Sequence, residues 1–294
     1  MAGQNTQSIP KAPDRLEVLA KIEQFEKEGK FDQDVEQDPP TIELLPNKVD
    51  YLQKKLSSKF MRGVAYKAAG KFMQNCIASG ALRITGLNGL ENWANVQTGA
   101  IITCNHFNIM DSLAMYYAFD SLHCKKRRMY RVIREGNYTN SPGGFGVIMR
   151  HCDTLPLSSN KETMVKFMRA VDTLLKKDNF VLVYPEEGMW WNYRKPRPLK
   201  EGAFKLAVRS NVPVVPVFIT LKDSDTIGPD GFAVQEYTIN VFPPIYPSKD
   251  KTKQQNIQYM MDENFRVWRE CYESTYGIKL AYTTQTKPEA DQEK

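Results

Sequence analysis

Hydrophobic and polar residues follow a regular pattern from about residue 81 to residue 275. Five short apolar runs have the length of buried strands: Ala100–Cys104, Tyr130–Arg134, Phe180–Tyr184, Val212–Thr220 and Tyr237–Phe242. Four longer stretches have helical spacing: Asp111–Phe119, Lys161–Lys176, Lys200–Arg209 and Lys253–Tyr272. Strands that alternate with helices of this length predict an α/β domain, with a largely parallel mixed sheet flanked by helices.

A separate helical pattern precedes this domain, between Lys48 and Ala78. Lysine and arginine lie between apolar residues that recur every three to five positions. These apolar residues are Leu52, Leu56, Met61, Val64, Ala68, Phe72 and Ile77. One apolar face with flanking cations is typical of a helix on anionic lipid. It is equally typical of a helix that packs on a core and exposes a basic face. Both interpretations stay open.

Composition divides the chain into four segments. Residues 1–47 are acidic and interrupted by prolines, which predicts a mobile or loosely docked arm. The amphipathic helical segment covers residues 48–80, the α/β domain covers 81–275, and a polar tail covers 276–294. The first 50 residues carry 11 acidic and 6 basic side chains, so the remainder has a net charge of +11 against +6 for the whole chain. A basic surface attracts the phosphates of nucleic acid, anionic lipid or coenzymes, and charge alone does not distinguish these ligands.

Several classes of protein are disfavoured. The five cysteines are an odd number without a C-x-x-C pair, which favours reduced thiols over a disulfide framework. No apolar secretory segment begins the chain, and no run reaches the roughly 18 apolar residues of a membrane span. We therefore expect a cytoplasmic protein that is at most peripheral to the cytoplasmic membrane face. The histidines lack the spacing of metal ligands, and no nucleic-acid-binding motif is present, so neither a metal nor nucleic acid is expected.

The first candidate for chemistry is His106, which directly follows the predicted strand Ala100–Cys104. Ligands of α/β sheets collect at the carboxyl ends of the strands. Asp111 lies five residues later, at the start of the next helix, where its carboxylate can orient the imidazole and leave one ring nitrogen free as a general base. A helix start alone also explains Asp111, because Asn108 and Asp111 have the spacing of a helix cap.

A second cluster of polar and aromatic residues follows the strand Phe180–Tyr184. It combines the carboxylates Glu186 and Glu187 with the adjacent pair Trp190 and Trp191 and with several cations. Adjacent exposed tryptophans usually mark a contact surface, and aromatic with cationic groups can hold a phosphate tail or a lipid headgroup. We therefore interpret this loop as a binding surface. The alternative is an exposed loop whose acidic residues cap the next helix.

These two clusters together resemble the motifs of the glycerolipid acyltransferases, the 1-acylglycerol-3-phosphate acyltransferase family. The family block N-H-x-x-x-x-D is matched by Asn105, His106 and Asp111. The block P-E-G after an aromatic residue is approximated by Tyr184, Pro185, Glu186 and Gly188, and the block V-P-[IV]-[IV]-P-V by residues 212–217. The resemblance covers roughly residues 80–245 and implies that residues 81–275 form an acyltransferase domain.

The chain departs from the family pattern at two places. An extra glutamate leaves open whether Glu186 or Glu187 is the family carboxylate. The two arginines that usually hold the acceptor phosphate are also missing from their positions. Three nearby cations are candidate substitutes: Arg150, Arg194 and Lys195. Lysine does not reproduce the two-pronged contact of arginine with phosphate.

The resemblance implies transfer of a fatty acyl group from an acyl thioester, acyl-CoA or acyl-ACP, to the hydroxyl of a lysophospholipid or glycerol-phosphate acceptor. It implies His106 as general base and Asp111 as its partner, and it assigns substrate binding to Asn105, Glu186, Glu187, Gly188, Arg150, Arg194 and Lys195. No cofactor is expected, and the protein would contact an anionic membrane. Two alternatives remain: a non-catalytic lipid- or nucleotide-binding protein, or an acyltransferase for an unphosphorylated lipid.

Overall fold

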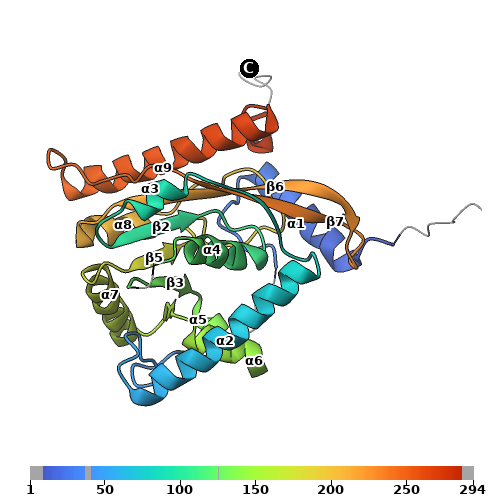
Figure 1. The fold of residues 1–294 in the computed structure, drawn as a ribbon. Helices are drawn as coiled ribbons and strands as arrows, with labels where there is room; N and C mark the ends of the chain where they lie inside the picture. Colours follow the sequence, from blue (N-terminus) through green and yellow to red (C-terminus); the bar gives the residue numbers. More distant parts are fainter. Residues whose placement is uncertain (1–8, 37–40, 125, 287–294) are drawn as a thin grey trace, which may run out of the picture.

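A seven-stranded sheet is the centre of the computed structural model, which describes residues 9–36, 41–124 and 126–286 (Figure 1). Its strand order is β1 (Arg83–Asn88), β7 (Ala233–Val241), β6 (Val214–Ile227), β2 (Ala100–Cys104), β5 (Phe180–Val183), β3 (Met129–Ile133) and β4 (Thr154–Pro156). Within these described residues, neighbouring strands are parallel except for the antiparallel pair β6–β7. The structure therefore confirms the predicted fold class.

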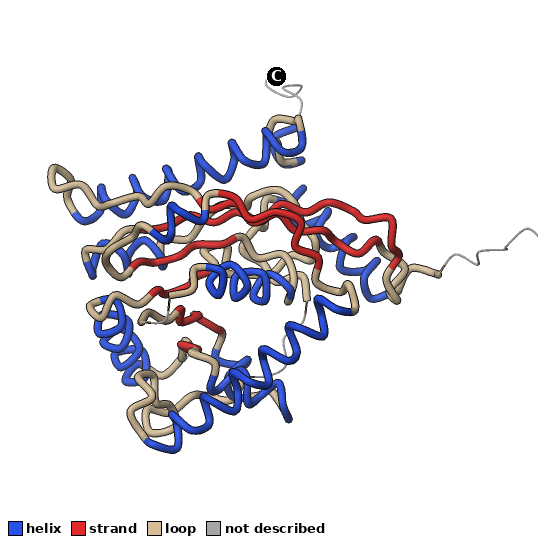
Figure 2. Tube along the Cα trace, viewed as in Figure 1, coloured by secondary structure: helices blue, strands red, loops and turns tan. Residues whose placement is uncertain are grey.

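Helices cover both faces of this sheet (Figure 2). On one face, α3 (Leu90–Ala94) and α4 (Met110–Ser121) pack against a core that contains Ile102 and Cys104. On the other, α7 (Lys161–Leu175), α8 (Gly202–Ser210) and α9 (Lys253–Tyr276) pack against a core that contains Ile101. Because side chains alternate along a strand and both faces are covered, β2 is buried throughout.

The predicted elements agree with the structure best where a long apolar run is buried on both faces. The predicted bounds of β2 and the start of α9 match the structure. The edge strands β1 and β4 were not predicted, and neither were the short helices α3, α5 (Glu135–Thr139) and α6 (Gly143–His151). The helix expected from Lys48 begins only at Leu56, as α2 (Leu56–Ala78). The carboxylate of Asp50 accepts the backbone N–H groups of residues 54 and 55, which holds the preceding segment in a turn.

The described part of the amino-terminal arm packs on the domain, contrary to the prediction of a mobile or loosely docked segment. It forms α1 (Pro13–Glu28), and Ile22 and Val35 join a buried cluster with Trp190. The buried carboxylate of Glu26 accepts a hydrogen bond from Lys195 Nζ at 2.6 Å. Residues 1–8 and 37–40 of the predicted arm, and 287–294 of the predicted tail, lie outside the described residues.

Candidate active site

His106 and Asp111 meet at the carboxyl end of β2. The Nδ1 atom of His106 lies 2.6 Å from the Oδ2 atom of Asp111. The Asp111 side chain is 0% exposed, and it also accepts the backbone N–H of Phe107 at 3.2 Å. The His106 side chain is 22% exposed, and its Nε2 atom has no hydrogen-bond partner among the described residues. One ring nitrogen is therefore held by a buried carboxylate, and the other is available to a ligand.

Tyr184 fixes the plane of the imidazole. Its ring stacks on His106 with the centroids 4.2 Å apart and the planes at 24°. Its hydroxyl lies 3.1 Å from the hydroxyl of Ser112 on α4. Burial, together with the nearby carboxylate of Asp111, raises the pKa of Tyr184 well above its usual value. Tyr184 is therefore a neutral phenol that supports the histidine from the end of β5.

Glu186, and not Glu187, is the carboxylate beside the histidine. The buried Glu186 side chain accepts the backbone N–H of His106 at 3.0 Å and the backbone N–H of Arg197 at 2.8 Å. Glu187 is exposed and has a φ of 63°. Gly188 is buried, and its carbonyl accepts a hydrogen bond from the Arg197 guanidinium. Of the two glutamates, the described contacts therefore place Glu186 beside the histidine loop.

Arg197 completes this arrangement, although the sequence analysis did not select it. Its side chain is 1% exposed and lies 3.2 Å from Glu186 Oε2. It also donates to the carbonyl of Phe31, in the segment after α1. The partners of Arg197 are distant in sequence, because Glu186 lies 11 residues away and Phe31 belongs to the amino-terminal arm. No local pattern of the sequence could have identified it.

Asn105 binds the protein backbone. Its side-chain amide donates to the carbonyl of Ile219 at 3.0 Å, and its side-chain oxygen accepts the N–H of the same residue at 2.8 Å. Both bonds connect the loop after β2 to the neighbouring strand β6. The described contacts of Asn105 therefore position the histidine loop, whereas the sequence analysis assigned this residue to substrate binding.

The two adjacent tryptophans do not form the expected exposed contact surface. Trp190 and Trp191 are 0% and 9% exposed. The indole N–H of Trp190 donates to the carbonyl of Gln33 at 3.0 Å, and the guanidinium of Arg15 lies over the ring of Trp191. The interpretation of this pair as a ligand surface was wrong, because the amino-terminal arm covers both rings.

The three cations proposed to replace the missing arginines each contact other protein groups. Arg150 donates to the carbonyl of Ser141 at 3.1 Å. Arg194 pairs with Asp223 at 2.7 Å, and Lys195 pairs with the buried Glu26 at 2.6 Å. Each of the three cations therefore has a protein partner in the structure, and their role in phosphate binding stays a prediction.

The thiol of Cys104, next to the histidine loop, does not provide a nucleophile. Cys104 is fully buried, and burial, reinforced by the charges of Asp111 and Glu186, raises the pKa of its thiol well above the usual value. Cys104 therefore stays protonated and inert. A direct attack by an acceptor hydroxyl is the simpler chemistry for this arrangement.

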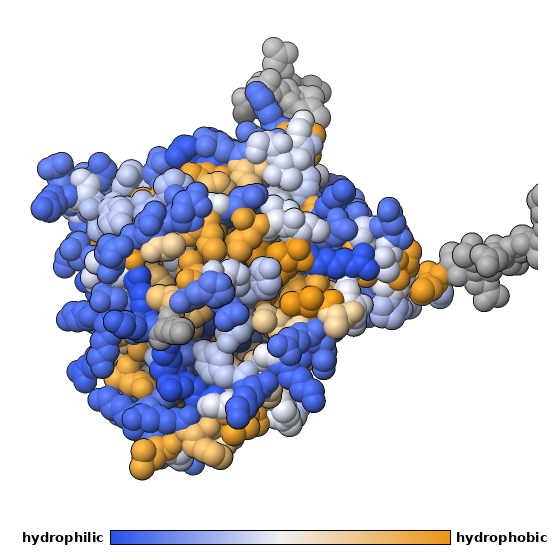
Figure 3. All heavy atoms as spheres, in the orientation of Figure 1, coloured by the Kyte–Doolittle hydropathy of each residue, from blue (hydrophilic) through white to orange (hydrophobic). Residues whose placement is uncertain are grey.

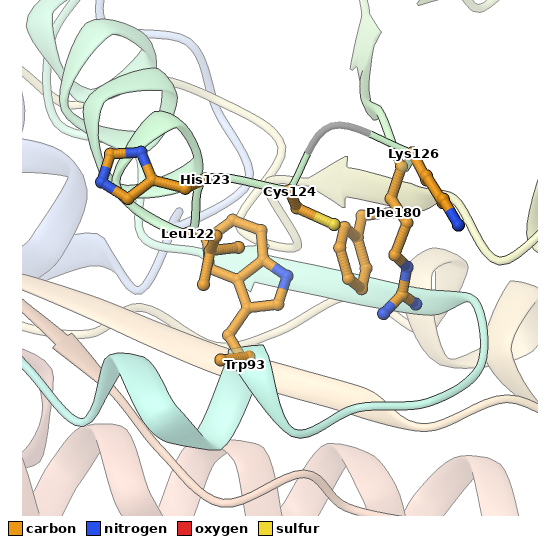
Figure 4. Close-up of a pocket in the computed structure, with 8 residues that line it drawn as sticks. Trp93, Leu122, His123, Cys124, Lys126 and Phe180 are labelled. Carbon is orange, nitrogen blue, oxygen red and sulfur yellow. The ribbon is translucent and has the colours of Figure 1, made fainter.

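A pocket of about 440 Å³ lies at the opposite end of the sheet, where β5 begins (Figure 4). Trp93 and Phe180 line it, and the side chain of His123 points away from Phe180. Arg127, which also lines the pocket, donates hydrogen bonds to the carbonyls of residues 96, 98 and 178. Because His106 follows the carboxyl end of a parallel strand, this pocket is separate from the His106 site.

Comparison with known proteins agrees with this geometry. Residues 83–220 match the family model described as Acyltransferase. The chloroplastic 1-acyl-sn-glycerol-3-phosphate acyltransferase BAT2 of Brassica napus is 29% identical over 170 residues. That alignment covers 56% of this chain and 46% of the relative, so the chain spans about half of that protein's length.

A solved structure shows the same fold. The 1-acyl-sn-glycerophosphate (LPA) acyltransferase PlsC from Thermotoga maritima superposes with a TM-score of 0.51, over 79% of this chain and 87% of that chain. The two sequences are 18% identical, so this similarity concerns the fold. The resemblance to glycerolipid acyltransferases that the sequence motifs predicted is confirmed for the domain.

Proposed function

We propose that this protein transfers a fatty acyl group from an acyl thioester to the hydroxyl of a lysophospholipid or glycerol-phosphate acceptor. The observation that carries the proposal is the 2.6 Å contact between His106 and Asp111 inside the region that matches the acyltransferase family. A buried carboxylate on one ring nitrogen and a free second nitrogen are what a general base requires.

In this mechanism the Nδ1–H of His106 donates to Asp111, and Nε2 removes the proton of the acceptor hydroxyl. The hydroxyl oxygen attacks the thioester carbonyl, and Asp111 stabilises the imidazolium. When the tetrahedral intermediate collapses, the carbon–sulfur bond breaks and the imidazolium returns its proton to the leaving thiolate. The donor, acyl-CoA or acyl-ACP, is a substrate, and these steps use only side chains of this chain.

We further propose that α2 rests on an anionic membrane. Leu56, Phe60 and Val64 are four residues apart along α2, so they lie on one side of the helix. Leu56 and Phe60 are 83% and 71% exposed, and exposed lysines flank them. Figure 3 shows hydrophobic side chains at the lower edge of the molecule, over the start of α2. None of the described helices is long and apolar enough to cross a bilayer.

This placement brings the membrane near the catalytic helix. The ring of Tyr66 on α2 is tilted by 43° against the ring of Tyr116 on α4, with the centroids 5.8 Å apart. Its hydroxyl donates to the carboxylate of Asp153 beside β4 at 2.6 Å. Because α4 also carries Asp111, the proposed membrane surface lies near the helix that holds the partner of His106. The cytoplasmic face of the membrane stays a prediction from sequence.

The test is an acyl-transfer assay with purified protein, a labelled acyl thioester, and acceptors with and without phosphate. Mass spectrometry of the lipid product is expected to show the acceptor plus one acyl group. A control with His106→Asn should give no such product. If labelled acyl reaches no acceptor while lipid still binds, the protein belongs to the alternative class of non-catalytic lipid-binding proteins. Transfer only to unphosphorylated lipids would support the other alternative.

A further inference from the structure

Arg131 differs from Arg194 and Lys195 in having no ion pair among the described residues. It lies in the middle of β3 and is half-buried. Its Nε atom is fully buried and forms no hydrogen bond, and one terminal nitrogen reaches only the sulfur of Met149 at 3.9 Å. No described carboxylate forms an ion pair with Arg131. A charge that is partly removed from water without a partner is unfavourable until an anion binds it.

The carboxylates that could neutralise this guanidinium are already occupied. Asp153 accepts Arg131's backbone N–H through its carbonyl, but its side chain is paired with Arg128 and Tyr66. Glu186 is paired with Arg197. The protein therefore leaves the charge of Arg131 available for a ligand, whereas Arg194 and Lys195 are held in ion pairs. Arg150 also has no ion pair with a described residue, but its guanidinium donates to the carbonyl of Ser141.

The sheet register places Arg131 on the same face as the catalytic residues. Arg131 pairs with Leu182 of β5, and Tyr184 lies two residues further along that strand, on the same face. Its positive charge partly opposes the effect of burial, which raises the pKa of Tyr184. Because Tyr184 stacks on His106, one ring separates the cation from the imidazole. Only β5 lies between β3 and β2 in the sheet. β3 and β2 are therefore separated by two interstrand spacings, each of about 4.8 Å.

We propose that Arg131 binds the phosphate monoester of the acceptor while the acceptor hydroxyl lies at His106. This inference rests on the proposed acyl transfer and names the residue that makes the enzyme prefer a phosphorylated acceptor. Arginine contacts two phosphate oxygens at once, and its unpaired donors suit that geometry. In this arrangement the glycerol part of the acceptor spans the distance between Arg131 and His106.

The test compares Arg131→Gln and Arg131→Lys with wild-type protein. The matched control is Arg169→Gln, because Arg169 is exposed on α7, on the other face of the sheet, and its loss removes one charge by the same substitution. Thermal unfolding checks that each variant is folded. Since Arg131 has no ion pair to lose, its substitution by glutamine is not expected to lower the unfolding temperature.

Binding is measured by calorimetry without an acyl donor, with hexanoyl lysophosphatidate and with the monoacylglycerol of the same chain. These two probes differ only in the phosphate. Arg131→Gln is expected to raise the Kd for the phosphorylated probe by about 10-fold or more and to change the Kd for the neutral probe by less than about 2-fold. Arg131→Lys should give an intermediate loss, and Arg169→Gln should equal wild type.

The same variants are then compared in the transfer assay through KM and kcat. Arg131→Gln is expected to raise KM for the phosphorylated acceptor and to leave KM and kcat for the neutral acceptor unchanged. Equal loss with both acceptors, or no loss with the phosphorylated probe, would overturn the role of Arg131 and leave the proposed transfer intact. If wild-type protein transfers no acyl group, the proposed function fails, but selective loss of phosphate binding would still support the Arg131 site.

Discussion

Substitution of Glu186 should both destabilise the protein and disturb the histidine loop. The Glu186 carboxylate joins the backbone of His106 to the buried side chain of Arg197. In Glu186→Ala, the 1% exposed guanidinium of Arg197 keeps only carbonyl partners for its charge. Removal of one partner of a buried ion pair typically costs about 3–5 kcal/mol. That loss is a large part of the roughly 5–15 kcal/mol that stabilises a typical domain.

A double-mutant cycle separates this effect from simple loss of packing. Arg197→Met removes the charge and keeps most of the side-chain volume. In the double variant neither buried charge is left unpaired, so the two losses should not add. We expect a coupling free energy of about 1.5–3 kcal/mol between the two positions, which is within the range for contacting residues.

The assay is urea unfolding followed by tryptophan fluorescence, because Trp190 lies 4.9 Å from the Arg197 guanidinium and reports on this region. Glu186→Gln, which keeps the shape of the side chain, should lose less stability than Glu186→Ala. Additive effects in the cycle, or a loss below about 1 kcal/mol for Glu186→Ala, would refute the assigned role of the ion pair.

Two further predictions concern the membrane and the imidazole. Each apolar side chain that enters lipid contributes about 1.5–3 kcal/mol, so Leu56→Ser with Phe60→Ser should weaken binding to anionic vesicles on the order of 100-fold in a sedimentation assay. Val165→Ser, at an exposed position of α7, is the control, and equal sedimentation of all proteins would contradict the membrane role of α2. Asp111→Asn should lower kcat by up to about 10⁴-fold through the wrong tautomer of His106, and a rate above half of wild type would contradict that role.

The sequence predicted the strands that carry a recognisable apolar run and missed the two edge strands, β1 and β4. β2 is apolar at nearly every position because both of its faces are covered, and its predicted bounds match the structure. β1 lies at the sheet edge, and its residues Arg83–Asn88 mix polar with apolar side chains without a clear period. β4 has only three residues, which is too short for any periodic signal.

The site was predictable only as far as local spacing determines it. His106 and Asp111 are five residues apart across a strand end and a helix start, so their contact follows from the chain's local path. The partners of Arg194 and Lys195 are Asp223 and Glu26, which are distant in sequence. Tertiary packing alone brings such groups together. For the same reason, the burial of Trp190 under the amino-terminal arm left no local signal.

The most direct test of the account is the rate of acyl transfer by His106→Asn. Asparagine keeps an N–H group that can donate to Asp111, but it has no basic nitrogen for the acceptor proton. The matched control is His123→Asn, because His123 is exposed and its φ of 50° is one that asparagine tolerates. His106→Asn is expected to lower kcat by about 10²–10⁴-fold at unchanged unfolding temperature, while His123→Asn should match wild type. Transfer by folded His106→Asn at more than about a tenth of the wild-type rate would contradict the role of His106 as general base.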